Sequence, residues 1–291
     1  MKVIHGRGFT ERERMAYKEV IFRNTLGSMR AILEAMDDLE LPLSYDTNRD
    51  YANTIMNMLS QGVHEQLPQG VVIAIQKLWL DPNVHQAYQS NLQYQFTESA
   101  IYFIESVERI AMSTYIPSDQ DILRSRISTF GISESSFMID NINFKMYDTG
   151  PERKKWIHCF DNVDAVLFVV AISEYDIPDR LEEEMRLFDY FCNSMWLVKT
   201  TFILFLNKMD RFKEKLLVTP LRNRFPEYDG DNDDKQASLY IANRFIGMNK
   251  SDKKQIYVHF TCAIDSNRIK FVMAAVSDFI SQSNLKDCSS L

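Results

Sequence analysis

The sequence has little glycine, few cysteines and no long hydrophobic run, and each shortage excludes a class of protein or site. Only nine of the 291 residues are glycine, and none begins a GxxxxGKS or GxxxxGKT loop, whose backbone would wrap a phosphate. The four cysteines are widely spaced and form no CxxC pair, so neither a zinc site nor a disulfide framework is indicated. The chain has no apolar run of about eighteen residues and no signal segment, so we expect membrane attachment only through a partner.

A strong excess of one charge sign is also absent. Lysine and arginine number 33 against 40 aspartates and glutamates, a net charge of −7, so general attraction to nucleic acid or to an anionic membrane is not expected. Apolar material, in contrast, is plentiful. Hydrophobic residues make up 45% of the chain, which is enough for a sizeable core in one large domain or two of ordinary size.

The first part of the chain, residues 10–118, has helical periodicity throughout. It opens with a capping box, in which Thr10 is followed three residues later by Glu13. The apolar residues that follow repeat at alternating spacings of four and three, which predicts one buried stripe on a long helix. The members of this stripe are Phe22, Leu26, Met29, Leu33 and Met36. We therefore expect an all-helical domain over residues 10–118.

After Pro117 the pattern changes to short apolar runs that alternate with amphipathic helices. Residues 137–139 and 142–147 are expected to form two strands joined by an Asp140–Asn141 turn. Continuous apolar runs, typical of strands buried on both faces of a parallel sheet, follow at 165–171, 201–206 and 256–261. With a helix over 179–194 between them, these runs predict a doubly wound α/β domain. The ligand of such a domain lies beyond the carboxyl ends of its strands.

Two of these strand ends carry residues suited to guanine. The run 201–206 leads directly into Asn207-Lys208-Met209-Asp210. An aspartate there can accept hydrogen bonds from the guanine N1–H and amine, the asparagine can bind the other base edge, and the lysine stem can cover the ring. The next strand ends at Thr261-Cys262-Ala263, where a backbone N–H could meet the guanine carbonyl. For the four-residue pattern alone, a solvated turn is the alternative interpretation.

A third strand end and the segment before it carry groups suited to a metal and a phosphate. Asp148 closes the run 144–147, where a carboxylate can hold a magnesium-bound water; an ordinary strand-end aspartate is the alternative. Upstream, Arg126 and Thr129 lie three residues apart in a segment that joins the two regions. Such a segment can present a guanidinium to a γ-phosphate and an oxygen to the metal.

Together with the stretch Lys154-Lys-Trp-Ile-His-Cys-Phe160, these residues resemble the alpha subunits of heterotrimeric G proteins. The likeness runs from Met1–His5, similar to the end of the family's first Ras-domain helix, to the terminal Asn284–Cys288. It implies a Ras-like GTPase domain over 1–9 and 119–291. The inserted helical domain would cover 10–118, and the two would clamp GDP or GTP.

The resemblance also implies roles for individual residues. Arg126 falls on the family's arginine finger, the catalytic position, and Thr129 and Asp148 fall on positions that hold Mg²⁺. The implied nucleotide-binding positions are Glu98, Ser99, Leu123, Arg124, Ser125, Arg126, Ile127, Ser128, Thr129, Asp148, Thr149, Gly150, Asn207, Lys208, Met209, Asp210, Cys262 and Ala263.

Two departures from the family pattern affect the expected activity. The family's first helix, first strand and phosphate loop have no counterpart in the sequence. At Asp148-Thr-Gly-Pro-Glu152, where the family has DVGGQRSE, the chain is three residues shorter, lacks the water-orienting glutamine and has Pro151, which has no N–H. We therefore expect weak nucleotide binding and negligible hydrolysis. A pseudo-GTPase interaction module and an incomplete gene model are the alternatives to a working signal transducer.

The resemblance implies protein partners as well. We expect a weakened complex with the G-protein beta/gamma dimer, which in the family contacts the segment around Lys155 and Trp156. A transmembrane receptor would bind the helix from Ser266 to the C-terminus, and an effector such as adenylate cyclase would complete the pathway. The expected location is the cytoplasm, at the inner face of the plasma membrane through these partners.

Overall fold

The computed structural model describes residues 8–58, 66–89, 99–139, 142–150, 152, 155, 157–160, 163–265, 269, 270, 272–274 and 276. The chain divides into two compact units, which are described separately below. A helical unit spans Arg7–Ser128, and an α/β unit spans Thr129–Leu291 together with Met1–Gly6.

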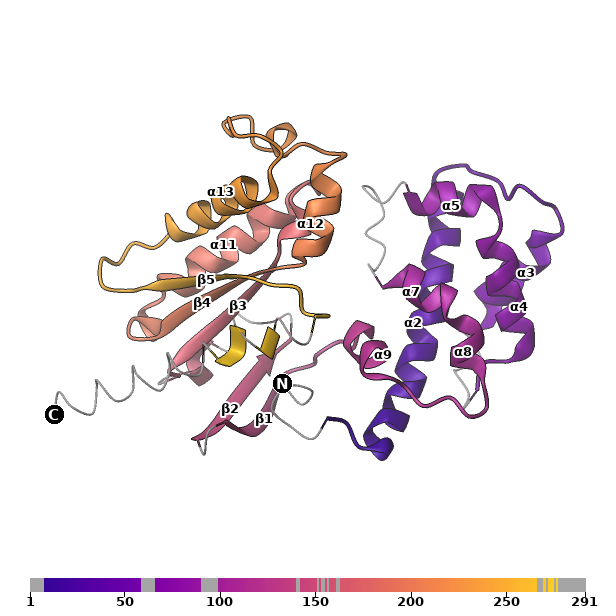
Figure 1. Ribbon diagram of the computed structural model, residues 1–291, viewed down its shortest axis with the longest axis horizontal. Coiled ribbons are helices and arrows are strands. Elements are labelled where there is room, and N and C mark those ends of the chain that lie inside the picture. Colours follow the sequence, from indigo (N-terminus) through magenta and orange to yellow (C-terminus); the bar gives the residue numbers. More distant parts are fainter. Residues whose placement is uncertain are drawn as a thin grey trace. The chain divides into compact units, whose positions relative to one another are not determined.

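The helical unit is built around one long helix, α2. Its described helices are α2 (Glu11–Asp38), α3 (Asn48–Met58), α4 (Gln69–Trp79), α5 (Pro82–Gln89), α7 (Ala100–Glu105), α8 (Val107–Ala111) and α9 (Asp119–Arg124) (Figure 1). The capping box predicted for α2 is confirmed: the Glu13 N–H donates to Thr10 Oγ1, and the Thr10 N–H donates to the Glu13 carboxylate. These bonds satisfy donors that the first turn of a helix leaves without partners.

The predicted apolar stripe of α2 forms the core of this unit. All five of its members are buried, with Leu26 and Met29 fully inaccessible to solvent. Helices α3, α5, α7 and α9 pack against α2, and α4 packs in turn against α3 and α8. Burial of this stripe explains why the 3.6-residue periodicity survives over 28 residues.

The α/β unit contains two sheets and the helices that cover one of them. Its strands are β1 (Ile132–Ile139), β2 (Ile142–Thr149), β3 (Ala165–Ala171), β4 (Thr201–Asn207) and β5 (Ile256–Phe260). Its described helices are η2 (Ile157–Phe160), η3 (Ile172–Glu174), α11 (Arg180–Cys192), η4 (Met195–Leu197), α12 (Met209–Leu216), η5 (Leu221–Asn223) and α13 (Asp234–Ile246) (Figure 1). Residues 269, 270, 272–274 and 276 are helical too.

The antiparallel pair β1–β2 is longer than the sequence predicts. The predicted strands covered 137–139 and 142–147, but pairing extends to Ile132 opposite Thr149. The extra residues of β1 are mostly polar and exposed, so no apolar run marks them. Backbone pairing across the hairpin satisfies their N–H and C=O groups instead. The predicted turn at 140–141 lies outside the described residues.

The parallel sheet has the order β3-β4-β5, with β3 at one edge of the three described strands. Phe168, Phe202 and Leu204 point into one core beneath α11, α12 and α13. Ile203 and Phe205 point to the other face, where Val272 and Val276 cover them. Burial on both faces explains the continuous apolar runs, and the predicted doubly wound arrangement is confirmed for this sheet.

Parallel pairing brings the carboxyl ends of β4 and β5 together. Leu206 pairs with Phe260, so the residues that follow each strand are neighbours. The Thr261 N–H donates to the Leu206 carbonyl at 2.9 Å, and the Met209 N–H donates to the Thr261 carbonyl at 3.2 Å. These bonds bring the two predicted base-binding segments side by side.

The two units meet in sequence between Ser128 and Thr129, ten residues beyond the domain limit predicted from the sequence. Helix α9 belongs to the helical unit because Arg109 binds Asp121 at 2.7 Å and Arg14 binds Asp119 at 2.5 Å. The predicted limits of 10–118 and of 1–9 with 119–291 stay a prediction about independently folding domains. Within the described part of the chain, no helix is both long enough and apolar enough to cross a membrane.

Candidate functional site

The predicted base-binding segment forms a sharp connection between β4 and α12. Asn207 is the last residue of β4, and α12 begins at Met209. Lys208, between them, has φ of 65° and ψ of 37°, the left-handed conformation that non-glycine residues rarely adopt. Backbone strain of this kind persists where the surrounding structure imposes it, often at functional sites. Asn207, Lys208 and Asp210 are all half-buried, so their side chains remain partly accessible.

The Asn207 side chain joins the ends of β4 and β5. Its Oδ1 accepts hydrogen bonds from Thr261 Oγ1 at 3.2 Å and from the Ala263 N–H at 3.0 Å. Thr261 is only 1% exposed, so its hydroxyl needs this partner. The orientation of the Asn207 amide is thereby fixed, with its oxygen on the protein side. The backbone N–H that we expected near a guanine carbonyl donates to Asn207 in this structure.

Two charged groups flank this connection. Lys208 Nζ lies 3.2 Å from Glu174 Oε1, and Arg180 Nε lies 3.5 Å from the other oxygen of the same carboxylate. Glu174 ends η3, directly after β3, so three consecutive strand ends contribute to the site. The carboxylate anchors the Lys208 ammonium and so restrains its stem.

Asp210 lies close to Cys262. Burial and the neighbouring Asp210 carboxylate raise the pKa of the Cys262 thiol above its usual value. The thiol therefore stays protonated at neutral pH and can donate to a carboxylate oxygen. Among the predicted base-binding residues, the structure thus brings Asn207, Lys208 and Asp210 together with Cys262 and Ala263.

The predicted metal-binding residues also lie together, at the other sheet of the α/β unit. Thr129 Oγ1 donates to Asp148 Oδ2 at 3.0 Å, which places two oxygen ligands of the kind Mg²⁺ prefers beside each other. The Gly150 N–H donates to the Gly131 carbonyl at 2.9 Å. A Cβ on Gly150 would lie 2.5 Å from the Thr129 carbonyl oxygen, so only glycine fits this approach.

Of the remaining predicted residues, Thr149 ends β2 in the α/β unit, and the others belong to the helical unit. Leu123 and Arg124 end α9, and the Arg124 guanidinium lies 4.6 Å from the Tyr102 ring centroid, a cation–π contact. Ser125 Oγ donates to the Ile122 carbonyl at 2.7 Å. Arg126, Ile127 and Ser128 are exposed. Ser99 precedes α7, whereas Glu98 lies outside the described residues.

A buried carboxylate holds α9 in place. Asp121 is fully buried and accepts hydrogen bonds from Arg109 at 2.7 and 2.9 Å, from Tyr102 at 2.6 Å and from the Ser118 N–H at 2.8 Å. Burial alone would raise the pKa of Asp121, but these donors outweigh it and hold the pKa below its usual range. The ionised carboxylate therefore fixes the helix that leads to Arg126.

Two residues of these contacts, Glu174 and Asn24, were not singled out from the sequence. Glu174 closely follows the predicted strand 165–171, and that position was its sequence signal. Asn24 lies in α2 and binds the backbone of Arg126. Its only sequence signal is a position beside an apolar stripe, which indicates packing.

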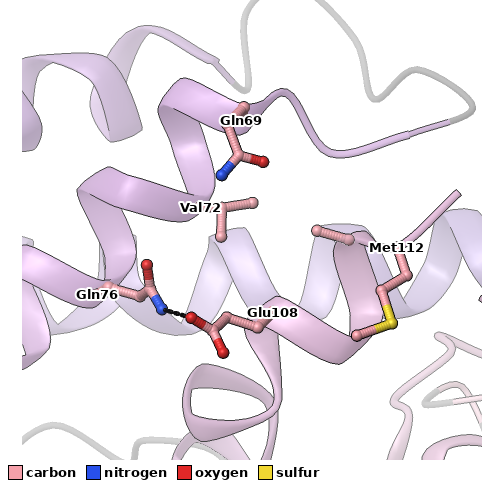
Figure 2. A pocket seen from close by; sticks show the side chains of 6 residues that line it. Gln69, Val72, Gln76, Glu108 and Met112 are labelled. Carbon is pink, nitrogen blue, oxygen red and sulfur yellow. Dashed lines mark hydrogen bonds between the residues drawn. The ribbon is translucent and has the colours of Figure 1, made fainter.

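A surface pocket lies elsewhere, within the helical unit. Gln69, Val72 and Gln76 of α4 face Glu108 and Met112 at α8, and Gln76 Nε2 donates to Glu108 at 2.6 Å (Figure 2). None of the predicted site residues lines this pocket.

Comparisons with known proteins agree with the sequence resemblance. A family model described as "G-protein alpha subunit" matches residues 1–280. The guanine nucleotide-binding protein subunit alpha of Emericella nidulans is 50% identical over 298 residues, covering 99% of this chain and 84% of its own length. Proteins of Cochliobolus heterostrophus and Neurospora crassa are 51% and 49% identical with the same coverage. Because 298 aligned residues exceed the 291 of the chain, at least seven positions of these relatives have no counterpart within the match.

Proposed function

Because the chain belongs to the G-protein alpha subunit family, we propose that it binds guanine nucleotides through residues 207–210 and acts as a signal transducer. The family's fold is a Ras-like GTPase domain with an inserted helical domain, and the family binds guanine nucleotides. The finer assignments to individual residues rest on the geometry described above, and the assignments of partners follow the family.

The observation that carries this proposal is the junction of Asn207 with Thr261 and Ala263. It fixes the asparagine so that its amide N–H groups are left to donate to a base. Asp210, an acceptor-only group when ionised, suits the guanine N1–H and exocyclic amine, which are both donors. The Lys208 stem, restrained by Glu174, suits the face of the ring.

Thr129 and Asp148 would hold Mg²⁺, which neutralises phosphate charge when bound. Their hydroxyl and carboxylate oxygens lie 3.0 Å apart and match the ligand type of this cation. In the helical unit, Arg126 supplies an exposed guanidinium that would stabilise charge developing on a transferred phosphoryl group. These roles describe a GTPase.

A second candidate, a nucleotide-binding interaction module that does not hydrolyse GTP, is favoured by one specific observation. The Gly150 N–H is engaged by the Gly131 carbonyl, and the next residue is Pro151, which has no N–H. This segment therefore offers few backbone donors to a γ-phosphate. Single-turnover phosphate release separates the two candidates: a GTPase should slow by about 1,000-fold on Arg126→Ala, whereas a module should show no release to slow.

The proposed partners follow the family. Alpha subunits work with a beta/gamma complex, a receptor and an effector. For this chain we place the beta/gamma contact at the segment around Lys155 and Trp156, and the receptor contact at the C-terminal region from Ser266. An effector such as adenylate cyclase and a location at the inner face of the plasma membrane complete the proposal.

Base recognition is tested by the Asp210→Asn variant. It replaces an acceptor with a group that can also donate, so GDP affinity should fall by at least about 100-fold. Xanthosine diphosphate carries a carbonyl where guanine carries its amine, so the variant should prefer it over GDP. Equilibrium titration with both nucleotides measures this reversal of preference.

The matched control is Asp229→Asn, an exposed aspartate in a loop of the same unit. It should leave both affinities within twofold of the wild-type values. An equal loss of affinity for both nucleotides in Asp210→Asn, or no loss of affinity for either, would contradict the proposed base site.

A further inference from the structure

The backbone of Arg126 is held by a single side chain from a distant part of the sequence. The Arg126 N–H donates to Asn24 Oδ1 at 2.6 Å, and Asn24 Nδ2 donates to the Arg126 carbonyl at 3.2 Å. Both polar groups of one peptide residue are therefore bound by one amide, in the manner of a strand pairing. Asn24 lies in the middle of α2, 102 residues before Arg126.

These two bonds fix a segment that packing does not fix. Arg126, Ile127 and Ser128 are exposed, and Ile127 keeps 54% of its surface in contact with solvent. Among the described residues, no other hydrogen bond of the Arg126 backbone is present. The preceding helix α9 is anchored separately, through the buried Asp121. Without Asn24, the extended segment after α9 would be restrained only at its two ends, by Asp121 in α9 and by the hydrogen bond of Thr129 with Asp148.

The Arg126 side chain, unlike the Arg126 backbone, is not held by another residue of the described chain. The guanidinium is exposed, and no ion pair or side-chain hydrogen bond joins it to another residue of the described chain. A fixed backbone with a guanidinium that pairs with no protein group is the arrangement expected for an arginine that stabilises negative charge developing on a bound ligand. Such a group stabilises a transition state most when it needs no reorganisation at the moment of reaction.

We propose that Asn24 is the positioning residue for Arg126, and that it sets where the guanidinium is presented to a guanine nucleotide. This inference rests on the proposed function, because it assigns Asn24 a role only if Arg126 acts on bound GTP. Asn24 also makes Arg126 part of the helical unit, since both members of the pair belong to residues 7–128. The Arg126 backbone is thereby tied to the helical unit.

The hydrogen bonds between Asn24 and the Arg126 backbone are tested without nucleotide. In the full-length chain, Asn24→Ala should accelerate hydrogen exchange of the Arg126 amide by about tenfold, because that amide loses its acceptor. The control is Arg23→Ala on the same helix, whose side chain is exposed and pairs with Glu19. It should leave exchange of this amide unchanged. An unchanged rate in Asn24→Ala would overturn the proposal.

The positioning role is tested by single-turnover phosphate release and GTP affinity. We expect Asn24→Ala to slow release by about 10- to 100-fold, as for a misplaced catalytic group, while GTP affinity changes by less than twofold. In the Arg126→Ala background, Asn24→Ala should have no further effect, because it acts through the arginine. Additive losses in the double variant would overturn the role, since they would show that Asn24 acts independently.

Failure of the proposed function gives a different result. If wild-type chain binds GTP with the Asp210-dependent preference but releases no phosphate, the positioning role is overturned and the base site stands. If Asp210→Asn keeps the wild-type preference between GDP and xanthosine diphosphate, the base site fails, whatever the exchange rate of the Arg126 amide.

Discussion

At the scale of single residues, Asn207 has two roles that a substitution can separate. Asn207→Asp keeps an oxygen for Thr261 and Ala263 but loses the amide donors, so stability should stay within about 0.5 kcal/mol while GDP affinity falls by about tenfold or more. Asn207→Ala removes the oxygen as well and leaves the buried Thr261 hydroxyl without its partner. It should cost an additional 1–2 kcal/mol, roughly, in the free energy of unfolding.

Urea unfolding and nucleotide titration of the two variants provide the measurements. Comparable losses of stability in both would contradict this separation, because the carboxylate of Asn207→Asp would then fail to replace the amide oxygen.

Asp121 should make the helical unit sensitive to acid. The pKa of its carboxyl is lowered in the folded state, so the folded state binds fewer protons than the unfolded state as pH falls toward the usual value of 3.8. Its contribution is therefore complete at neutral pH and is lost progressively below about pH 4. At pH 7, Asp121→Asn should reduce the free energy of unfolding by about 1.5–3 kcal/mol, and it should flatten the pH dependence.

Urea titrations at pH 7 and pH 3.5, followed by circular dichroism, test this expectation. Asp119→Asn is the control, because Asp119 pairs with Arg14 near the surface and should contribute at most about 1 kcal/mol. A larger effect of Asp119→Asn than of Asp121→Asn would refute the assignment.

The individual residues of the candidate site differ in how well the sequence predicts them. Asn207, Lys208 and Asp210 follow an apolar run, and parallel strands bring such ends together, so their grouping was predictable. Asn24 was not, because the pattern of α2 reports the buried stripe and carries no information on a contact 102 residues away. The engagement of the Ala263 N–H by Asn207 was also missed, since it depends on side-chain geometry.

At the scale of elements, Lys254 connects the end of α11 with η4 through hydrogen bonds. Lys254 Nζ donates to the carbonyls of Cys192 at 2.5 Å and Leu197 at 2.7 Å, and lies 4.7 Å from the Phe202 ring centroid. It therefore satisfies carbonyls at the end of α11 and in η4. Lys254→Met should keep most of the packing but lose both bonds, at a cost of about 2 kcal/mol.

Thermal and urea unfolding measure this cost. The neighbouring Lys253→Met is the matched control, since Lys253 is exposed and should change stability by less than about 0.5 kcal/mol. Equal effects of the two substitutions would argue against the role of Lys254.

Element boundaries were predicted best where burial dictates the sequence. The bounds of β3 coincide with the predicted run 165–171, because both faces of the parallel sheet are covered. Helix α11 is shorter than the predicted 179–194 by one residue at its start and two at its end. The hairpin β1–β2 was underestimated, because its outer residues are exposed and their pairing leaves no apolar signal.

At the scale of the whole molecule, each unit has its own hydrophobic packing, which predicts two unfolding steps. One core lies among the helices of residues 7–128, and two further cores lie on the two faces of the parallel sheet. Because each of these described cores lies within one unit, we expect Asp121→Asn to shift only one transition in urea and Lys254→Met only the other. Circular dichroism and tryptophan fluorescence would follow the steps. A single transition shifted equally by both variants would contradict this expectation.

The edge position of β3 has a consequence for how the chain behaves in solution. Its seven residues are all apolar, without a charge, a proline or a bulge, and β4 is its one strand neighbour in the described part of the chain. Natural edge strands usually carry such features to prevent intermolecular pairing, and short apolar segments of high β-propensity are those that form fibrils. Val169 is 51% exposed, so Val169→Lys should place a gatekeeper charge on this edge. Light scattering at rising protein concentration should then show later onset of aggregation in the variant than in the wild type.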